Sequence, residues 1–167
     1  MGASKILLVD DEADFLETLV RRLEKRNMNV TGVQSGEEAL KLLDQHPVDV
    51  VVLDVKMPGM EGIQVLREIK RRQPTVEVIM LTGHANVEAA FQGMELGAFD
   101  YLIKPVNIEE LLKKIRDACE LSGFRKFEKI QKPILHSCNN QQVNFGTSPP
   151  SLFLRLDAFL LPPFRYE

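Results

Sequence analysis

Five short apolar segments recur in the first two thirds of the chain, and a stretch with a helical pattern follows each of them. They span Lys5–Val9, Asn29–Val33, Val48–Leu53, Glu77–Leu81 and Phe99–Ile103. Short runs that are apolar on both faces are typical of buried parallel strands. Their alternation with helices predicts an α/β domain whose parallel sheet is covered on both faces. Right-handed crossovers then favour a flavodoxin-like, doubly wound sheet of five strands in the order 2-1-3-4-5.

Helix-start and helix-stop residues flank the stretches between these segments. Ser35 and Glu38 have the spacing of a capping box, which satisfies free N–H groups in a first helical turn. Pro74 is expected to stop the third helix, and Gly97 to follow the end of the fourth. In residues 13–27 the apolar side chains fall on one helical stripe, made of Phe15, Leu16, Leu19, Val20 and Leu23.

The composition divides the chain in two. Its 167 residues, 44% hydrophobic and 27% charged, fit a folded domain of ordinary size plus an additional segment. The formal net charge of −3 gives no reason to expect direct nucleic-acid binding. Residues 123–167 carry six Lys and Arg against three Asp and Glu, and residues 136–150 have the turn-forming composition of a linker. We therefore expect a domain at residues 1–122 and a C-terminal extension at residues 123–167 without a recognisable output domain.

Compartment is indicated by what the sequence lacks. No signal peptide begins the chain, and no apolar run approaches the ~20 residues of a membrane span. Cys119 and Cys138 have neither metal-site spacing nor the density of a secreted disulfide scaffold. We expect a cytoplasmic protein with reduced thiols and no membrane contact.

Polar side chains follow four of the five predicted strands. Asp10 and Asp11 come directly after the first strand, Asp54 after the third, Thr82 after the fourth and Lys104 after the fifth. Because ligands of doubly wound sheets bind at the carboxyl ends of the strands, where the strand order reverses, these side chains are expected to converge there. Carboxylates so close together repel one another and are costly to desolvate, so the cluster calls for a functional explanation.

A phosphoryl-transfer site would explain the cluster. Mg²⁺ prefers one or two carboxylates, water and a phosphate oxygen as ligands, and it would relieve the repulsion. A carboxylate can also attack phosphorus and form an aspartyl phosphate. Such transfer needs mainly positioning and neutralisation of the phosphoryl oxygens. Lys104 offers a compact positive charge for that purpose, and Thr82 offers a hydroxyl donor.

Four motifs in this order, LLVDDE, VVVLDVKMPGMEG, VIMLTGHA and AFDYLIKP, resemble the receiver domain of two-component response regulators. The resemblance covers about residues 4–122. Within this family, the sequence is similar to receivers of enhancer-binding transcription regulators. It implies a phosphorylation-dependent switch that accepts a phosphoryl group from a sensor histidine kinase onto Asp54. In this reading Asp10, Asp11, Asp54 and the backbone carbonyl of Lys56 hold Mg²⁺. The chain would catalyse only its own phosphorylation and dephosphorylation and is otherwise no enzyme.

The resemblance implies further roles. Thr82 and Lys104 would bind the phosphoryl group, with a cis bond between Lys104 and Pro105, and Tyr101 would turn inward as the aromatic switch. Activation would change the face formed by residues 86–121, through which such domains often dimerise. Lys56 and His84, each two residues beyond a site residue, are expected to tune the lifetime of the phosphorylated form.

Other readings stay open on the residues alone. Asp10 and Asp11 could cap a helix, Asp54 could be a turn residue, and Tyr101 could be an ordinary strand aromatic. A pseudo-receiver that binds without phosphorylation and an aspartyl-phosphate phosphohydrolase are the alternative functions. The hydrolase is disfavoured because Lys56 stands where its second carboxylate would be expected. No GxxxxGK[ST] phosphate loop or helix-turn-helix pattern follows, so the extension could be a docking segment, an occluding segment or a loosely ordered tail.

Overall fold

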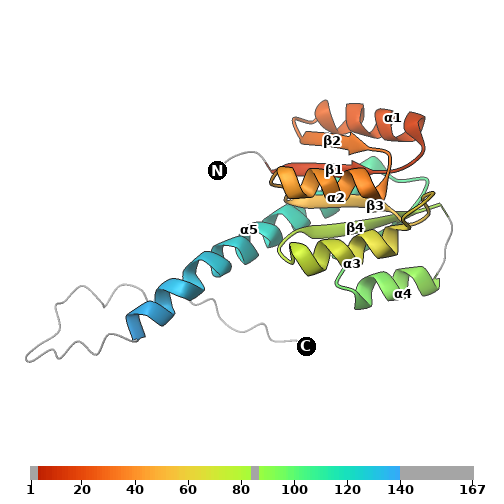
Figure 1. Ribbon diagram of the computed structural model, residues 1–167. Helices are drawn as coiled ribbons and strands as arrows, with labels where there is room; N and C mark the ends of the chain where they lie inside the picture. The colour runs from red at the N-terminus through yellow and green to blue at the C-terminus, as the bar shows by residue number, and fades with distance from the viewer. Residues whose placement is uncertain (1–3, 84–86, 140–167) are drawn as a thin grey trace, which may run out of the picture. The chain divides into compact units, whose positions relative to one another are not determined.

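The computed structural model describes residues 4–83 and 87–139, with side chains for residues 4–83 and 90–129 (Figure 1). Strands and helices alternate as predicted. They are β1 (Lys5–Val9), α1 (Ala13–Glu24), β2 (Asn29–Val33), α2 (Gly36–Gln45), β3 (Val50–Asp54), α3 (Gly62–Arg72), β4 (Glu77–Thr82), α4 (Val87–Glu95), β5 (Asp100–Ile103) and α5 (Ile108–Asn139). All four strand pairs are parallel, in the order β2-β1-β3-β4-β5. The predicted fold class and strand order are confirmed.

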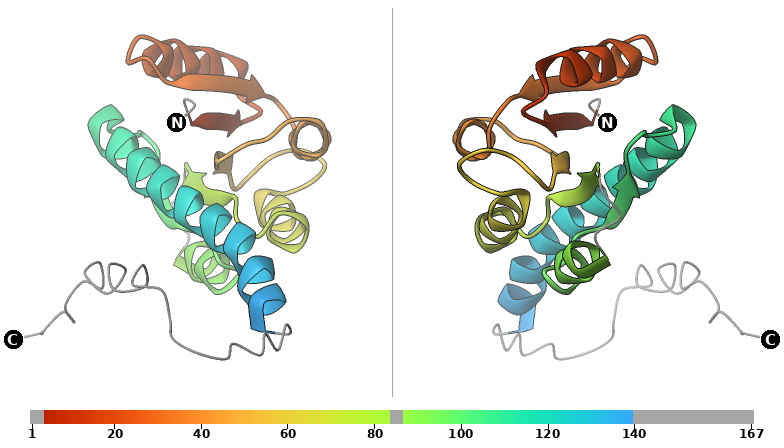
Figure 2. Two further views of the ribbon diagram at one scale, coloured as in Figure 1. Left: turned by 90° about the vertical axis from the view of Figure 1, so that its left-hand side faces the viewer. Right: turned by 90° about the vertical axis from the view of Figure 1, so that its right-hand side faces the viewer.

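Each face of the sheet has its own apolar core, because successive side chains of a strand point to opposite faces. Leu7, Val51 and Val78 point toward α2 and α3, whereas Leu8, Val52 and Ile79 point toward α1 and α5. The two end-on views show α1 and α5 on one side of the strands and α2, α3 and α4 on the other (Figure 2). Double coverage explains why the central strands read as continuous apolar runs.

Some element ends differ from the sequence-based expectation. The first helix ends at Glu24 because the chain reverses at Asn27, whose φ of 60° lies in the left-handed region that asparagine tolerates. The capping box at Ser35 is half formed: its Oγ accepts from the Glu38 N–H at 3.2 Å, but the Glu38 carboxylate accepts from Gln34 instead. Gly97 follows α4 with a φ of 88°, as expected for a residue just beyond a helix.

Helix α5 is longer than expected. It continues through residues 136–139, so the first four residues of the predicted linker are helical, and the rest of that segment lies outside the described residues. The chain divides into two units at residue 132, and the sheet and the site belong to the first. No helix in the described part of the chain is both long and apolar enough to cross a membrane.

Charged side chains join α5 to the amino edge of the sheet beyond the predicted boundary at residue 122. Arg125 Nη1 lies 2.9 Å from the carboxylate of Glu77, which is only 1% exposed and also pairs with Lys70 at 3.3 Å. The next residue of α5, Lys126, pairs with Asp49. A buried carboxylate is tolerated only with such partners. The first residues of the extension therefore belong structurally to the sheet domain.

Arg125→Met is expected to lower the free energy of unfolding by about 2 kcal/mol, since it leaves buried Glu77 with Lys70 alone. Urea denaturation measures the change. Arg21→Met is the matched control, because Arg21 and its partner Glu17 are 70% and 63% exposed and such pairs contribute little. Adding Glu77→Gln to Arg125→Met should recover part of the loss. Equal effects of the two arginine substitutions would contradict this account of the buried pair.

Candidate functional site

Asp10, Asp54 and Lys104 meet at the carboxyl edge of the sheet. Asp10 directly follows β1 and Asp54 ends β3, and the two residues are 3% and 4% exposed. The Lys104 ammonium, carried by the loop after β5, lies 2.6 Å from Asp10 Oδ2 and 3.2 Å from Asp54 Oδ1. Three residues far apart in sequence thus form one buried cluster of alternating charge. The arrangement arises because β1 and β3 are central neighbours in the sheet and β5 ends at the same edge.

Backbone hydrogen bonds fix the orientation of both carboxylates. The Glu12 N–H donates to Asp10 Oδ1 at 3.0 Å, and the Lys56 N–H donates to Asp54 Oδ2 at 3.0 Å. In each case an Asp side chain closes a turn onto the residue two positions later, a turn that Asp favours. The other oxygen of each carboxylate faces Lys104. Each strand therefore ends in a carboxylate with one oxygen held by backbone and one directed into the site.

Thr82 and Tyr101 belong to the neighbouring strands. Thr82 ends β4, is 1% exposed, and accepts at its backbone carbonyl a 2.6 Å hydrogen bond from the Lys104 N–H. Tyr101 lies in β5, half-buried against the core that contains α2 and α3. The bond between Lys104 and Pro105 is cis. Thr82 is thus placed beside the residue that carries the ammonium.

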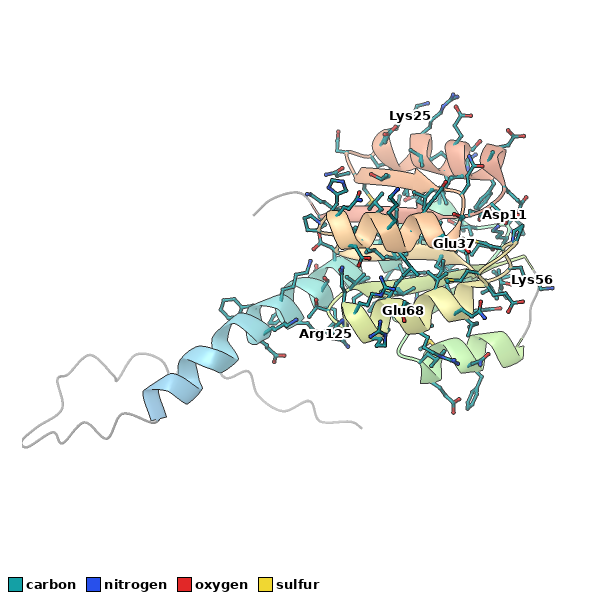
Figure 3. All side chains as sticks on the ribbon, in the orientation of Figure 1. Asp11, Lys25, Glu37, Lys56, Glu68 and Arg125 are labelled. Atoms are coloured by element: carbon teal, nitrogen blue, oxygen red, sulfur yellow. The ribbon has the colours of Figure 1, made fainter. Side chains whose placement is uncertain are left out.

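Asp11 and Lys56 lie at the rim of the same edge. Figure 3 shows the two labelled side chains at one end of the sheet and Arg125 at the other. Asp11 is half-exposed and Lys56 is exposed, so neither is part of the buried cluster. His84 lies outside the described residues.

Burial and mutual charge shift the pKa values of the three charged side chains in the site. Burial raises the pKa of Asp10 and of Asp54 above the ordinary range, although the Lys104 charge opposes the rise in both. Burial by itself lowers the pKa of Lys104, but hydrogen bonding to Asp10 and the charges of Asp54 and Asp10 raise it overall. Lys104 therefore stays protonated at physiological pH. With two carboxylates against one ammonium, the cluster retains a negative charge that favours a further cation.

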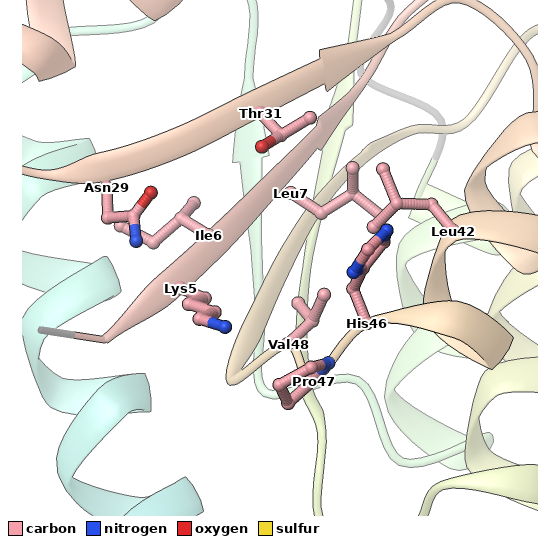
Figure 4. A pocket seen from close by; sticks show the side chains of 9 residues that line it. All are labelled: Lys5, Ile6, Leu7, Asn29, Thr31, Leu42, His46, Pro47 and Val48. Atoms are coloured by element: carbon pink, nitrogen blue, oxygen red, sulfur yellow. The ribbon is translucent and has the colours of Figure 1, made fainter. Parts of the chain in front are cut away.

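Two pockets lie elsewhere. One of about 360 Å³ opens at the amino ends of β1 and β2 and includes Lys5, Asn29 and His46 (Figure 4). A second of about 350 Å³ includes Ser4, Arg116 and Cys119. Neither of these two pockets contains any of the predicted site residues.

Comparison with known proteins assigns the family. Residues 6–116 match the family model of the response regulator receiver domain. The chain belongs to the response regulator receiver family. Among relatives, it is 34% identical over 128 residues to a putative NtrX-like response regulator of Rickettsia bellii, covering 75% of this chain and 27% of that protein. It is 38% identical over 164 residues to the transcriptional regulatory protein CpxR of Escherichia coli, covering 98% of this chain and 63% of CpxR.

A solved receiver structure agrees with the fold. The receiver domain protein from Clostridium thermocellum superimposes with a TM-score of 0.70 at 37% identity, covering 72% of this chain and 98% of that one. The domain is accordingly a receiver of the kind found in response regulators of two-component systems. The chain spans between about a quarter and two thirds of the length of the curated relatives named above.

Receiver domains generally use Mg²⁺, and the residues of this site fit such an ion. Asp10 Oδ2 is buried, and apart from the Lys104 ammonium 2.6 Å away it has no hydrogen-bond partner among the described residues. Together with Asp54 it offers the hard oxygen ligands that Mg²⁺ prefers. Within residues 4–83 and 87–139, however, no three His, Cys, Asp or Glu side chains are already grouped to hold a metal. In this arrangement Lys104 lies between the two buried carboxylates.

Two receiver residues near Lys104 were not anticipated as site residues. The carboxylate of Glu12 lies 3.1 Å from the ammonium, and the ring centroid of Phe15 lies 4.5 Å from it. Phe15 was predicted only as part of the apolar stripe of the first helix. The third acidic residue in the sequence Asp10-Asp11-Glu12 was the available signal for Glu12. No sequence signal pointed to Phe15, because its contact with Lys104 depends on where the fifth strand ends.

Asp10→Asn is expected to stabilise the metal-free receiver at pH 7 by about 1 kcal/mol, because it removes a buried charge whose pKa is raised by burial. A carboxyl with a raised folded-state pKa takes up its proton in the folded state first. The contribution of Asp10 to wild-type stability should therefore fall as pH rises through its folded-state pKa, and the advantage of the variant should disappear as pH is lowered.

Thermal denaturation across pH, with and without Mg²⁺, measures both effects. The wild-type receiver should gain more stability from Mg²⁺ than the variant, because ligand binding to the folded state stabilises it. Asp14→Asn, which changes an exposed residue of α1, serves as control and should change neither quantity. A destabilised Asp10→Asn at pH 7 would contradict the prediction.

Proposed function

We propose that Asp54 accepts the phosphoryl group of a phosphohistidine on a partner sensor kinase. The bond between phosphorus and the histidine nitrogen breaks while a bond from phosphorus to a carboxylate oxygen of Asp54 forms, and the histidine nitrogen retains the electron pair. Water later cleaves the acyl phosphate to inorganic phosphate. The single observation that carries the proposal is the buried pairing of Asp54 with Lys104 at 3.2 Å, at the carboxyl edge of the sheet. A positive charge at this point can neutralise the arriving phosphoryl oxygens.

The carboxylates of Asp10, Asp11 and Asp54 and the backbone carbonyl of Lys56 would hold Mg²⁺, which neutralises phosphoryl oxygens when bound. The buried position and raised pKa of Asp10 support its role as a ligand that gains from a cation. Lys104 binds one phosphoryl oxygen through its ammonium. Thr82, buried beside it at the end of β4, donates its hydroxyl to another.

Output would pass from Thr82 to Tyr101, which turns further into the domain when Thr82 moves. The face of α4, β5 and α5 would then engage a second receiver, and the exposed side chains of Phe91, Met94 and Ile103 support this because they offer apolar area there. Lys56 and His84 would tune the lifetime of the phosphorylated form. Residues 1–122 would form the receiver and 123–167 an extension to it, and the kinase partner implies a cytoplasmic protein.

The decisive experiment incubates the full chain with acetyl phosphate and Mg²⁺ and follows intact mass and released phosphate. A receiver gains the mass of one phosphoryl group and loses it slowly. A phosphohydrolase releases phosphate continuously from varied monoesters without stable labelling. A pseudo-receiver shows neither change, and that result would overturn the proposal. Light scattering before and after labelling tests the dimer.

A further inference from the structure

We propose that Glu12 and Phe15 are positioning residues that hold the Lys104 ammonium at the mouth of the site during phosphoryl transfer. The inference rests on the proposed function of Lys104 and adds the groups that place it. Among the described residues, the Lys104 ammonium lies near carboxylate oxygens of Asp10, Glu12 and Asp54, at 2.6, 3.1 and 3.2 Å, and near the Phe15 ring, at 4.5 Å. Asp10 and Asp54 already have roles. Glu12 and Phe15 have none so far.

The number of N–H donors on the ammonium explains why the contacts with Glu12 and Phe15 matter. A lysine ammonium has three N–H donors and a flexible four-carbon stem. In the metal-free site three carboxylates lie within 3.2 Å of the ammonium and compete for these donors. Once Asp54 carries a phosphoryl group and Asp10 faces a cation, those two carboxylates no longer hold Lys104. Besides the phosphoryl oxygen that Lys104 would then bind, the Glu12 carboxylate and the Phe15 ring remain close to it among the described residues.

Local structure explains why both side chains reach Lys104. Glu12 occupies the N-cap position of α1, yet its side chain makes no capping hydrogen bond. Its carboxylate is therefore available to the ammonium, with which it forms a 3.1 Å hydrogen bond. Phe15 lies in the first turn of the same helix and is half-buried against the core shared by α1 and α5. The core fixes the ring, and the ring in turn limits where the lysine stem can lie.

Of the two side chains, Phe15 should attract the Lys104 ammonium more strongly than Glu12 does. The Glu12 side chain is 65% exposed, so water and salt screen its attraction to Lys104. The Lys104 side chain is only 11% exposed, and an aromatic ring attracts a partly desolvated ammonium more strongly than an exposed one. The ring also consumes no N–H donor. All three donors stay available for carboxylate or phosphoryl oxygens.

A purely structural role for Phe15 is the competing explanation, since apolar residues of α1 build the core. The variants Phe15→Leu and Phe15→Tyr distinguish a positioning role of Phe15 from a purely structural one. Both keep apolar bulk at the position, but only tyrosine keeps the ring face. If the ring positions Lys104, tyrosine should preserve function and leucine should not.

The first measurement is independent of metal and of phosphorylation. The Lys104 ε-methylene protons of the metal-free full chain are observed by NMR, where a nearby ring face shifts them upfield. Phe15→Leu should abolish the upfield shift and Phe15→Tyr should preserve it. The second measurement is the phosphorylation rate constant with acetyl phosphate at saturating Mg²⁺. We expect Phe15→Leu to lower it about threefold without changing the half-saturating Mg²⁺ concentration, and Phe15→Tyr to retain it.

A double-mutant cycle with Lys104→Met tests whether the effect passes through the lysine. In that background Phe15→Leu should cause no further loss. Glu12→Gln should lower the wild-type rate constant less than twofold, and only at low ionic strength. A normal rate in Phe15→Leu, or an equal loss with and without Lys104, would overturn this inference alone. A wild-type chain that accepts no phosphoryl group would overturn the proposed function and this inference with it.

Discussion

Asp54→Asn is expected to reduce phosphoryl incorporation from acetyl phosphate to background, whereas the wild-type chain gains one phosphoryl group. The substitution keeps the size of the side chain and its hydrogen bond from the Lys56 N–H, which lies 3.0 Å from Asp54 Oδ2. It removes the anionic oxygen that attacks phosphorus, and a carboxamide is not a comparable nucleophile. Intact-mass measurement before and after hydroxylamine, which cleaves acyl phosphates, identifies the modified group.

The matched control is Asp44→Asn. Asp44 is 53% exposed, pairs with Arg72 on the surface, and lies on α2 away from the carboxyl edge. It should leave both labelling and stability unchanged. Undiminished labelling of Asp54→Asn would show that another residue is the acceptor. Loss of labelling in both variants would show that the assay reports folding or metal binding instead.

Gly62→Ala should destabilise the domain by about 3 kcal/mol, an effect near the upper end for overpacking. A Cβ at this position would lie 2.1 Å from the Asp54 carbonyl oxygen and 2.9 Å from Val55 Cα, and both are backbone atoms that no side-chain rotation can relieve. Gly62 begins α3 and donates its N–H to the Val55 carbonyl at 3.0 Å. The close approach joins α3 to the end of the strand that carries Asp54.

Gly123→Ala supplies the control, because a Cβ there meets nothing within 4 Å and the position lies inside α5. Alanine favours helix over glycine, so this variant should be as stable as wild type or up to about 1 kcal/mol more stable. Urea denaturation compares the two variants directly. Phosphorylation of Gly62→Ala should also slow, since any relief of the clash moves the backbone beside Asp54. Equal stability of the two variants would contradict the close packing.

The main features of the fold and the core of the site followed from local patterns. Apolar segments with polar ends predicted the strands, and strand ends of one parallel sheet share an edge. Asp10, Asp54, Thr82 and Lys104 could therefore be grouped before any distance was known. Glu12 and Phe15 could not, because their contact with Lys104 joins the start of α1 to the loop after β5, ninety-two residues away for Glu12.

At the amino edge of the sheet, the contacts of Glu77 likewise could not be predicted from the sequence. Glu77 was predicted as the first residue of a strand, and its near-complete burial could not be anticipated from a charged residue at a segment boundary. Its partners come from α3 and from α5, and Arg125 lies beyond the boundary expected at residue 122. Composition changes near residue 123, but α5 continues through it, and ion pairs across the sheet edge leave no periodic signal in the sequence.

The sequence by itself determined the alternation of strands and helices, the parallel sheet and the edge at which the carboxylates, the threonine and the lysine gather. The spacing of hydrophobic residues and the residue types at strand ends are local properties, so they can be recognised in the sequence without coordinates. Tertiary structure alone decided that Lys104 bridges Asp10 and Asp54 at 2.6 and 3.2 Å, that Phe15 lies beside it, and that Arg125 neutralises buried Glu77. Those contacts depend on how separate elements approach one another. Their strength depends on burial, which no single segment of the chain specifies.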